Sequence, residues 1–403
     1  MADQTHHAPT TNSDDPLTVA EVEAVARTRL PSHVYNYYAG GSDGQHAVRR
    51  NRDAFASVNI VPRVLRDVKE VSTETEIFGR TSALPIAFAP SAMQRLAGGE
   101  GEIDTARAAV KAGLSLTLSS QSTVSLEDVM EAAKAAADGG VEPNFWFQIY
   151  LTADWEWNTQ LIARAEEETA DLVFAAAGYK ALVLTVDTPV LGNRLGERKS
   201  PVVLPRHLKL ANYPADNRGK PSLNRQLMDA RTAAQARKIT SDARGTLHDP
   251  SLDWHVVARL KSLTSMKVIL KGVMAPEDAR LAVEKGADAI VVSNHGGRQL
   301  DDIPSTLEVL PAVAEAVAGR IPVIFDGGVR QGSHVFKAIA LGADLVLVGR
   351  PVLWGLGYKG QEGVEAVVHI LERELSRTMA LAGVTTVADI ANATLVHRAN
   401  ARL

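Results

Sequence analysis

Eight short apolar segments recur along this chain, and their number constrains the fold more than any other feature. They are LPIAFAP (84–90), LSLTLS (114–119), FWFQIY (145–150), ALVLTVD (181–187), KVILKG (267–272), AIVVSNH (289–295), PVIFDGG (322–328) and LVLVGR (345–350). Stretches with helical periodicity, such as GEIDTARAAVKAG, separate them. Apolar strands that alternate with amphipathic helices are typical of a parallel sheet covered on its outer face. Eight strands close such a sheet, so the sequence predicts an α/β protein, a (β/α)8 TIM barrel. A doubly wound sheet is disfavoured because the first strand runs into APSAM, without a G-x-G-x-x-G turn.

Segments outside this pattern define the rest of the chain. The helical pattern TVAEVEAVARTRL (18–30) and the following VYNYYAGG (34–41) predict an N-terminal extension that packs outside the barrel. About eighty residues separate the fourth and fifth strands, and the polar stretch 199–250 within them is predicted to be a long lid loop. We expect a disordered polar tail over 1–16, one barrel domain over 17–393 and a C-terminal tail over 394–403.

Composition excludes several classes of function. The formal net charge of −4 argues against nucleic acid as a partner, since phosphate backbones select for basic proteins. The chain has no cysteine, which excludes disulfides, thiolate metal sites and thiol nucleophiles. Its histidines lack metal-ligand spacing such as H-E-x-x-H, so no metal site is predicted. No apolar run reaches the roughly eighteen residues of a membrane span, so no membrane association is expected.

Polar residues stand where the predicted strands end. In a (β/α) barrel the chemistry lies at the carboxyl ends of the strands, so these residues are the site candidates. Any one of them alone is better explained as a solvated loop residue, but eight strand ends converge on one rim. In chain order the candidates are Gln148, Tyr150, Thr185, Asp187, Lys271, Ser293, His295, Asp326, Gly349 and Arg350.

The loops after the seventh and eighth strands have the composition of a phosphate site. DGGVRQG (326–332) supplies Gly327 and Gly328 for close backbone approach and places Arg330 at a helix start, while GRP (349–351) adds Arg350. Backbone N–H groups at a helix start together with two guanidinium groups suit a phosphate dianion. Tight turns with surface arginines are the structural alternative.

SNHGGRQLD (293–301) is more specific. His295 and Arg298 lie three residues apart on a glycine-containing turn, so both can face one small molecule. An imidazole accepts a proton near neutral pH and a guanidinium binds a carboxylate bidentately. Asp187, at another strand end, is the expected partner that orients the imidazole.

In these residues the sequence resembles a known family, the FMN-dependent L-2-hydroxy-acid oxidases and dehydrogenases, and among them glycolate oxidase and the peroxisomal 2-hydroxy-acid oxidases. The likeness runs from about residue 17 to 390 and includes VYNYYAGG, FAPSAMQ, LTVDTPVLGNR, LKGV, SNHGGRQLD, DGGVR and GRP in family order. The resemblance implies an FMN cofactor, a small 2-hydroxy acid as substrate and O2 as electron acceptor.

The resemblance also implies roles for individual residues. His295 is the implied base with Asp187 behind it, and Tyr150 bonds the substrate hydroxyl. Lys271 stabilises the reduced flavin. Arg298 and Tyr37 are implied to bind the substrate carboxylate, with Arg194 as an auxiliary cation. The implied FMN contacts are Ala89, Pro90, Ser91, Ser119, Gln148, Thr185, Lys271, Ser293, Asp326, Gly327, Gly328, Arg330, Gly349 and Arg350.

Departures from the family pattern concern the substrate. Gln121 stands where glycolate-type enzymes carry a tryptophan that walls the substrate pocket, which predicts a wider or more polar pocket and makes lactate or a longer 2-hydroxy acid plausible beside glycolate. Val190 and Asn193 replace basic residues of the plant-type segment. Hydride and carbanion mechanisms both stay open.

The sequence leaves three functional hypotheses open. An oxidase that releases hydrogen peroxide is favoured over a lactate monooxygenase or a dehydrogenase with another acceptor, and a catalytically silent phosphate- or flavin-binding barrel is the third. The terminal Ala401-Arg402-Leu403 matches the small–basic–leucine peroxisomal signal, which predicts recognition by a peroxisomal import receptor, or a cytoplasmic enzyme if that signal is not read. The resemblance implies a homo-oligomer, a tetramer or an octamer.

Overall fold

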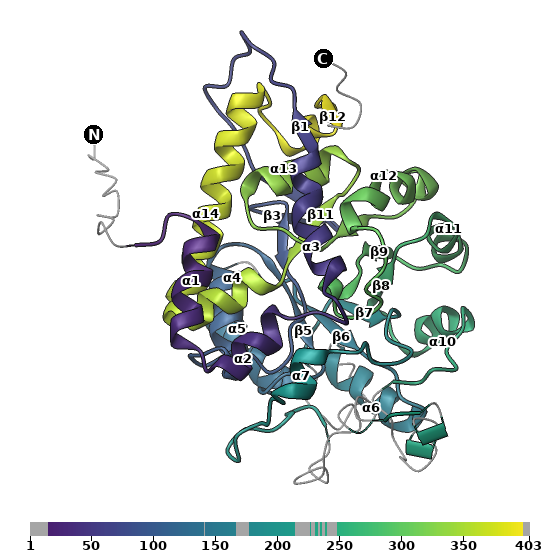
Figure 1. The fold of residues 1–403 in the computed structure, drawn as a ribbon. Helices are drawn as coiled ribbons and strands as arrows, with labels where there is room; N and C mark the ends of the chain where they lie inside the picture. The colour runs from purple at the N-terminus through teal and green to yellow at the C-terminus, as the bar shows by residue number, and fades with distance from the viewer. Residues whose placement is uncertain are drawn as a thin grey trace.

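The computed structural model describes residues 15–140, 142–166, 177–213, 226, 230–232, 234–235, 238–239 and 248–397. Eight parallel strands form a closed barrel in the order β10-β11-β4-β5-β6-β7-β8-β9 (Figure 1). They are β4 (Ile86–Phe88), β5 (Ser115–Ser119), β6 (Trp146–Ile149), β7 (Ala181–Thr185), β8 (Lys267–Val273), β9 (Ala289–Val292), β10 (Val323–Phe325) and β11 (Leu345–Val348). Each lies within or beside a segment predicted from the sequence, and the predicted TIM barrel is confirmed.

The strands are apolar on both faces because both are covered. All five residues of β5 and all five of β7 are buried. Alternate strand residues, including Ala87, Trp146 and Val183, form one buried cluster, whereas their neighbours belong to the larger cluster that includes the helices. Such alternation is expected when one set of side chains fills the barrel and the other packs outward.

A hairpin closes the amino-terminal end of the barrel. It consists of β2 (Thr75–Ile77) and β3 (Arg80–Ser82), paired antiparallel. Phe78 at its turn packs edge-to-face on Trp146, the first residue of β6, with ring centroids 5.7 Å apart. Ligand chemistry is therefore left to the opposite, carboxyl end.

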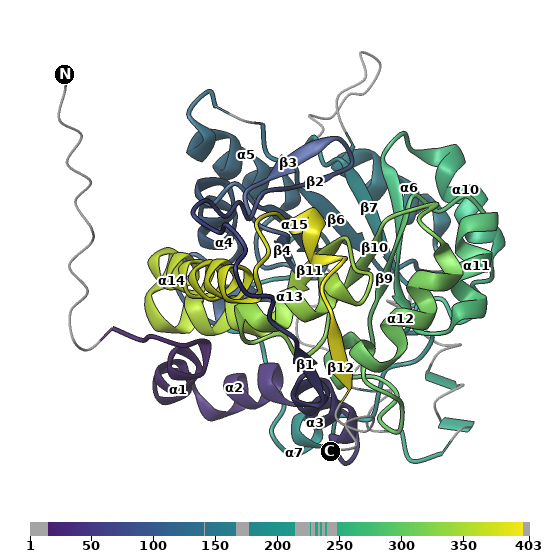
Figure 2. The same ribbon diagram turned by 90° about the horizontal axis from the view of Figure 1, so that it is seen from above.

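Helices surround the barrel, as the view from above shows (Figure 2). The outer layer comprises α4 (Glu102–Lys111), α5 (Leu126–Ala137), α6 (Trp155–Ala165), α10 (His255–Leu263), α11 (Pro276–Glu284), α12 (Thr306–Val317), α13 (Gly332–Ala340) and α14 (Arg350–Ala382). Local sequence sets their starts: Ser305 and Glu308 form a capping box on α12, for example. Within α14 the helix is broken at Lys359 and Gly360, where Gly360 has φ 57°.

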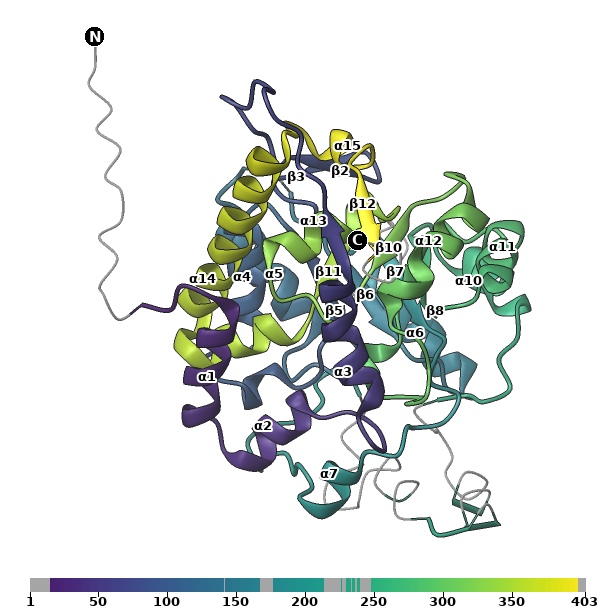
Figure 3. The same ribbon diagram turned by 45° about the horizontal axis from the view of Figure 1, so that its top comes forward.

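The N-terminal extension packs outside the barrel as predicted. Helix α1 (Val19–Arg29) lies beside α14, and α2 (Ser32–Ala39) and α3 (His46–Asp53) lead from it across the carboxyl end of the barrel (Figure 3). After a 3-10 turn, η1 (Ala54–Ser57), strand β1 (Val58–Ile60) pairs antiparallel with β12 (Leu395–His397) near the other end of the chain.

Three further short elements lie outside the connection between β7 and α10: η2 (Gln94–Leu96), η4 (His295–Gly297) and α15 (Val387–Ile390). Part of the predicted C-terminal tail, 395–397, thus forms a strand, whereas the terminal Ala-Arg-Leu lies outside the described residues. The predicted limits of one barrel domain, 17–393, stay a prediction.

The long connection between β7 and α10 is described in part. It contains the short helix α7 (Leu195–Lys199) and continues to residue 213, and it is described again from 248. Much of the predicted lid, 199–250, lies outside the described residues, as do residues 1–14 of the predicted tail. Among the described helices, none combines the length and apolarity needed to span a membrane.

Candidate functional site

The turn after β9 holds His295 in an unusual backbone conformation. His295 has φ 57°, followed by Gly296 at 62° and Gly297 at 78°. A side chain rarely adopts this left-handed region without a functional or packing reason. Gly297 is required here, because a Cβ would lie 2.6 Å from the backbone nitrogen of Val48. The His295 N–H donates to Ser293 Oγ at 3.1 Å, which fixes the turn.

His295 and Asp187 form the pair predicted from the sequence. The imidazole Nδ1 lies 2.9 Å from Asp187 Oδ1, and Thr188 Oγ1 donates to the same oxygen at 3.0 Å. Gly272 makes room for Asp187: a Cβ there would lie 2.6 Å from the Asp187 Cβ. Because Nδ1 faces a carboxylate, it carries the proton of the neutral ring, and Nε2 keeps its lone pair.

The protonation states of this pair suit a base. Burial lowers the pKa of His295 and outweighs the opposing effect of Asp187. Burial alone would raise the pKa of Asp187, but His295 and Lys271 outweigh it, so that pKa is lowered. Near neutral pH the imidazole is therefore unprotonated at Nε2 and the carboxylate is charged.

Tyr150 faces the free nitrogen of this imidazole. Its hydroxyl lies 3.5 Å from His295 Nε2. Burial, followed by the charge of Asp187, raises the pKa of Tyr150 above its ordinary value, so the phenol stays protonated. A hydroxyl donor and a nitrogen acceptor therefore meet at one point, where an alcohol can bond to both.

Lys271 brings a buried positive charge next to them. Its Nζ donates to Ser293 Oγ at 2.8 Å and lies 3.2 Å from Asp326 Oδ2. Burial acts to lower the pKa of Lys271, but Asp326 and Asp187 outweigh it, so the pKa is raised and the ammonium keeps its charge. Strand ends β8, β9 and β10 thus converge on one polar centre.

Two arginines lie close together: Arg298, which follows η4, and Arg194, which belongs to the long connection between β7 and α10. Arg298 bonds to the carbonyl oxygens of Tyr37 and Gly40 and lies over the Tyr37 ring, with the guanidinium carbon 4.9 Å from the ring centroid. Arg194 Nε donates to the Arg298 carbonyl oxygen at 3.3 Å. The three residues predicted to hold a carboxylate, Tyr37, Arg194 and Arg298, are therefore together.

Glu197 joins these two arginines and was not predicted. Its Oε1 lies 3.0 Å from Arg298 NH2 and 3.5 Å from Arg194 NH1, and all three side chains are largely buried. Burial, followed by the charge of Arg298, lowers the pKa of Arg194. The spacing of Arg194 and Glu197, three residues apart with a helical turn between them, was the signal that could have found it.

A row of polar side chains crosses neighbouring strand ends. Ser119 Oγ lies 3.3 Å from Gln148 Oε1, and Gln148 Nε2 donates to Thr185 Oγ1 at 3.0 Å. Gln121 follows on the loop after β5, where its N–H donates to Ser119 Oγ at 3.1 Å and its carbonyl accepts from Met93. These groups offer donors and acceptors along one edge of a flat ligand.

The residues after β4 lie in the adjoining corner. Ala89 N donates to Val348 O at 3.0 Å, which joins the loop after β4 to the end of β11. A Cβ at Gly349 would contact the Ala89 Cβ and Ser91 Oγ, at 3.5 and 4.0 Å. The predicted segment Ala89–Pro90–Ser91 and the predicted Gly349 are thus neighbours.

The predicted phosphate loops gather arginines. Burial, followed by Arg52, lowers the pKa of Arg330 to about 10. Its Nε is buried and has no hydrogen-bond partner among the described residues, with Glu23 3.9 Å away. Burial and the charges of Arg298, Arg330 and Arg52 lower the pKa of Arg350 well below its ordinary value. Repulsion among these guanidinium groups is relieved by an anion.

Arg350, Gly327 and Gly328 also have structural roles. Arg350 donates to the carbonyl oxygens of Tyr38, Gly40 and Gly296, at 2.7, 2.8 and 3.0 Å, which ties α2 to the turn of His295. A Cβ at Gly328 would lie 1.9 Å from the Asn51 oxygen, so this glycine is needed for packing against α3. Gly327 has φ 111°. Phosphate contact by these glycines stays a prediction.

His248 is a second residue that the sequence did not indicate. It is the first residue of the described segment that leads into α10. Its ring packs edge-to-face on Tyr150, with ring centroids 4.4 Å apart. No motif surrounds it, and a lone histidine in a long polar segment is normally solvated.

Comparison with known proteins places this chain in a family. The sequence model of the FMN-dependent dehydrogenase family matches residues 26–397 of this chain. The chain belongs to the FMN-dependent dehydrogenase family. It is 42% identical over 383 residues to a 2-hydroxyacid oxidase of Dictyostelium discoideum, covering 95% of this chain and 91% of that protein. It is 44% identical over 372 residues to glycolate oxidase of Spinacia oleracea, covering 92% and 93%.

Solved structures agree with this assignment. A crystal structure of mandelate oxidase with (S)-4-hydroxymandelic acid superposes with a TM-score of 0.81 at 38% identity, covering 95% of this chain and 99% of that one. The predicted family and FMN cofactor are confirmed. The residues at the carboxyl end of the barrel fit FMN: the buried Arg330 Nε and Asp326 Oδ1, without partners among the described residues, are a donor and an acceptor that a phosphorylated, hydroxylated cofactor can satisfy.

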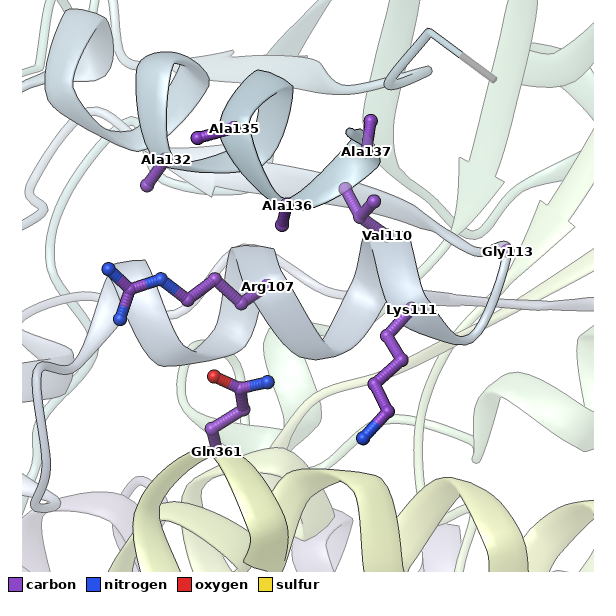
Figure 4. Close-up of a pocket in the computed structure, with 9 residues that line it drawn as sticks. All are labelled: Arg107, Val110, Lys111, Gly113, Ala132, Ala135, Ala136, Ala137 and Gln361. Atoms are coloured by element: carbon purple, nitrogen blue, oxygen red, sulfur yellow. The ribbon is translucent and has the colours of Figure 1, made fainter. Parts of the chain in front are cut away.

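A separate cavity lies on the outer wall of the barrel. It measures about 580 Å³, lies between α4, α5 and α14, and is lined by Arg107, Val110, Lys111, Gly113, Ala132, Ala135, Ala136, Ala137 and Gln361 (Figure 4). None of the predicted site residues lines it. Arg107 and Lys111 form ion pairs with Glu100 and Glu365. Its lining of alanines and ion-paired surface residues provides no reactive group.

Proposed function

We propose that this protein oxidises small L-2-hydroxy acids to 2-oxo acids with FMN and passes the electrons to O2, releasing hydrogen peroxide. Family membership supports FMN-dependent oxidation of 2-hydroxy acids. The single observation that carries the chemistry is the His295–Asp187 pair at 2.9 Å, with the Tyr150 hydroxyl 3.5 Å from the free imidazole nitrogen. A base, its orienting carboxylate and a hydroxyl donor are the groups that oxidation of an alcohol needs.

In this proposal His295 accepts a proton at Nε2 and Asp187 stabilises the resulting imidazolium. Tyr150 donates to the substrate oxygen and orients it. When bound, FMN supplies the two-electron acceptor, and the alcohol loses two electrons and two protons to become a carbonyl. Lys271 would place a fixed positive charge beside the cofactor and would stabilise, without reorganisation, the negative charge that the cofactor gains with the electrons.

The substrate carboxylate is bound by Arg298 and Tyr37, with Arg194 as the auxiliary cation. Glu197 holds the two guanidinium groups and partly neutralises them, so the site keeps a fixed geometry before an anion arrives. Gln121, on the loop after β5, makes the pocket wider or more polar than one walled by tryptophan, which favours lactate or a longer 2-hydroxy acid.

The cofactor is held by the row of polar side chains at neighbouring strand ends, Ser119, Gln148 and Thr185, and by the arginines Arg330 and Arg350. The contacts proposed for it are Ala89, Pro90, Ser91, Ser119, Gln148, Thr185, Lys271, Ser293, Asp326, Gly327, Gly328, Arg330, Gly349 and Arg350. Ser119, Gln148 and Thr185 are already hydrogen-bonded to one another, which supports a preformed edge. We also propose a peroxisomal location, through the terminal Ala-Arg-Leu, and a tetramer or octamer.

Peroxide release from a panel of L-2-hydroxy acids tests this function. We expect a yellow protein that L-lactate bleaches without oxygen, and one H2O2 for each 2-oxo acid formed in air. Pyruvate as product supports the oxidase, whereas acetate from lactate would indicate a monooxygenase. A protein that binds no flavin, or binds it and is not reduced by any member of the panel, would refute the proposal.

A further inference from the structure

One carboxylate lies among the arginines of the proposed phosphate site. Glu23, on α1, has its Oε1 3.4 Å from Arg52 NH2 and its Oε2 3.9 Å from Arg330 Nε. Within the part of the chain that the structure describes, no other acidic residue forms an ion pair with either arginine. Two guanidinium groups, one from α3 and one from the loop before α13, therefore share a single counter-charge that the outer helix α1 supplies.

The neighbouring helix α2 fixes the position of Glu23. The Tyr35 hydroxyl donates to Glu23 Oε1 at 3.1 Å, and the Tyr35 ring stacks on Trp354 with ring centroids 5.1 Å apart. The side chains of Glu23 and Arg330 are only 16% and 15% exposed. A carboxylate that is held in place and largely removed from solvent acts on nearby charges more strongly than a mobile surface carboxylate does.

The contact between Glu23 and Arg330 is electrostatic and is not a hydrogen bond. At 3.9 Å, Glu23 Oε2 lies beyond hydrogen-bond distance of Arg330 Nε, and this buried nitrogen has no hydrogen-bond partner among the described residues. Arg330 NH1 donates to the carbonyl oxygen of Val329 at 2.7 Å. Glu23 thus offsets part of the charge of Arg330 and leaves its Nε–H group to a ligand.

Repulsion among the arginines gives this carboxylate its importance. Burial and the charge of Arg52 lower the pKa of Arg330. Burial and the neighbouring arginines, Arg298 first among them, lower the pKa of Arg350. Glu23 acts in the opposite direction on both groups. A phosphate dianion bound at Arg330 would relieve the same repulsion with two charges instead of one, and Glu23 would repel it, because like charges at short range oppose each other.

We infer that Glu23 is a built-in counter-anion of the cofactor site: it holds Arg330 and Arg52 in place in the FMN-free protein and weakens the binding of the FMN phosphate. This inference rests on the proposed function, which assigns the phosphate to Arg330 and Arg350, and it adds a residue that sets the affinity for that phosphate. Riboflavin is FMN without its phosphate. The effect of Glu23 must therefore appear with FMN and vanish with riboflavin.

Two variants of Glu23 test this inference. Glu23→Gln removes the charge and keeps an oxygen for the Tyr35 hydroxyl, whereas Glu23→Asp keeps the charge on a shorter side chain. The full-length protein, freed of FMN, is titrated with FMN and with riboflavin, and quenching of flavin fluorescence gives both Kd values. In Glu23→Gln, FMN should bind about tenfold more tightly and riboflavin within about twofold of the natural protein. In Glu23→Asp, both Kd values should stay within about threefold.

Glu21→Gln is the matched control, because it removes the same charge from the same helix. Glu21 accepts from the Leu17 N–H at 2.6 Å and, among the described residues, pairs with no arginine of the site. Both Kd values should be unchanged in this variant. Thermal unfolding gives a second readout: Glu23→Gln should lower the Tm of the FMN-free protein, where the arginines lose their counter-charge, and should leave the Tm of the FMN-loaded protein nearly unchanged.

Weaker or unchanged FMN binding in Glu23→Gln, or an equal change for riboflavin, would overturn the inference. Should this variant unfold without FMN, the release of FMN from the loaded protein gives the same comparison: slower release supports the inference, and equal or faster release overturns it.

A third variant separates the inference from the proposed function. Arg330→Gln should weaken FMN binding and spare riboflavin binding. An unchanged ratio of the two Kd values in Arg330→Gln would remove the proposed phosphate contact and the inference with it. A ratio that falls in Arg330→Gln but does not rise in Glu23→Gln would overturn the inference alone. Tighter FMN binding in Glu23→Gln by a protein that oxidises no 2-hydroxy acid would support the inference and refute the proposed function.

Discussion

The two ends of the barrel use aspartate in opposite ways. At the amino end, Asp288 precedes β9 and its Oδ2 accepts from the Val268 N–H and from Lys261 Nζ, at 2.7 and 2.6 Å. Asp344 precedes β11 and accepts from the Val323 N–H at 2.7 Å. At the carboxyl end the aspartates position side chains of the candidate site instead: Asp187 Oδ1 lies 2.9 Å from His295 Nδ1, and Asp326 Oδ2 lies 3.2 Å from Lys271 Nζ. The same residue type ties strands together at one end and positions side chains at the other.

The difference extends to single atoms. Asp187 Oδ2 and Asp326 Oδ1 are buried and have no hydrogen-bond partner within the part of the chain that the structure describes. A buried acceptor without a partner costs about 1–3 kcal/mol, so a fold retains one only where something else is gained. The unpaired oxygens lie at the carboxyl end, which is where the proposed cofactor and substrate bind. Aspartate at the amino end ties strands together, whereas each of these aspartates at the carboxyl end keeps an unpaired oxygen where the ligands are proposed to bind.

The largest expected effect separates chemistry from binding at the carboxyl end. His295→Gln removes the base but keeps a polar side chain of similar reach, so flavin reduction by L-lactate should slow by about a thousandfold or more, within the range for a lost general base. Anaerobic stopped-flow absorbance measures the rate. The flavin spectrum of the purified variant is the control, because FMN should remain bound. Reduction at the natural rate would refute the role of His295.

Asp187→Asn tests the carboxylate behind the base. We expect reduction about a hundredfold slower, because the amide neither fixes the tautomer nor stabilises the imidazolium. Burial lowers the pKa of His295 while Asp187 opposes that effect, so kcat/KM of the natural enzyme should fall with acidification only below the ordinary pKa of histidine. Removing the charge of Asp187 should move that decline to still lower pH. A shift to higher pH would contradict this electrostatic account.

Much of the carboxyl end could be predicted because it rests on two general rules. Apolar periodicity located the eight strands, and the convergence of parallel strand ends placed Asp187, Lys271 and His295 together. Neither rule depends on loop conformation. The resemblance then supplied roles that the spacing of these residues alone could not.

Residues of the long connections escaped prediction for a physical reason. Glu197 and His248 belong to a polar stretch whose composition is that of a solvated loop, and only their three-dimensional placement buries them beside Arg298 and Tyr150. Likewise the three carbonyl partners of Arg350 come from segments far away in sequence. Apart from the three-residue spacing of Arg194 and Glu197, these contacts between loops have no periodicity, so a single sequence carries no signal for them.

Glu197→Gln tests whether a carboxylate at the carboxyl end of the barrel holds the guanidinium groups of Arg194 and Arg298 in place. The variant leaves Arg194 and Arg298 charged and buried without their shared anion, so we expect a loss of about 2 kcal/mol in the free energy of unfolding. An added anion should compensate, so oxalate should bind more tightly and raise Tm more than it does in the natural protein. Glu142→Gln is the matched control, because Glu142 forms an exposed pair with Lys180. Weaker oxalate binding in Glu197→Gln would instead indicate that Glu197 mainly orients the arginines.

The smallest expected effect on catalysis lies at the amino end. Asp288→Asn keeps an oxygen that accepts from the Val268 N–H but loses the partly exposed ion pair with Lys261, so the free energy of unfolding should fall by about 1 kcal/mol or less. Asp288→Ala also loses the backbone hydrogen bond and should cost about 1–2 kcal/mol more. Urea unfolding measures both variants, and kcat/KM for L-lactate should be unchanged in each. Because the hairpin with Phe78 closes this end against ligands, a rate loss in Asp288→Ala comparable to that of Asp187→Asn would mean that the two ends are not independent, and the division of labour between them would be wrong.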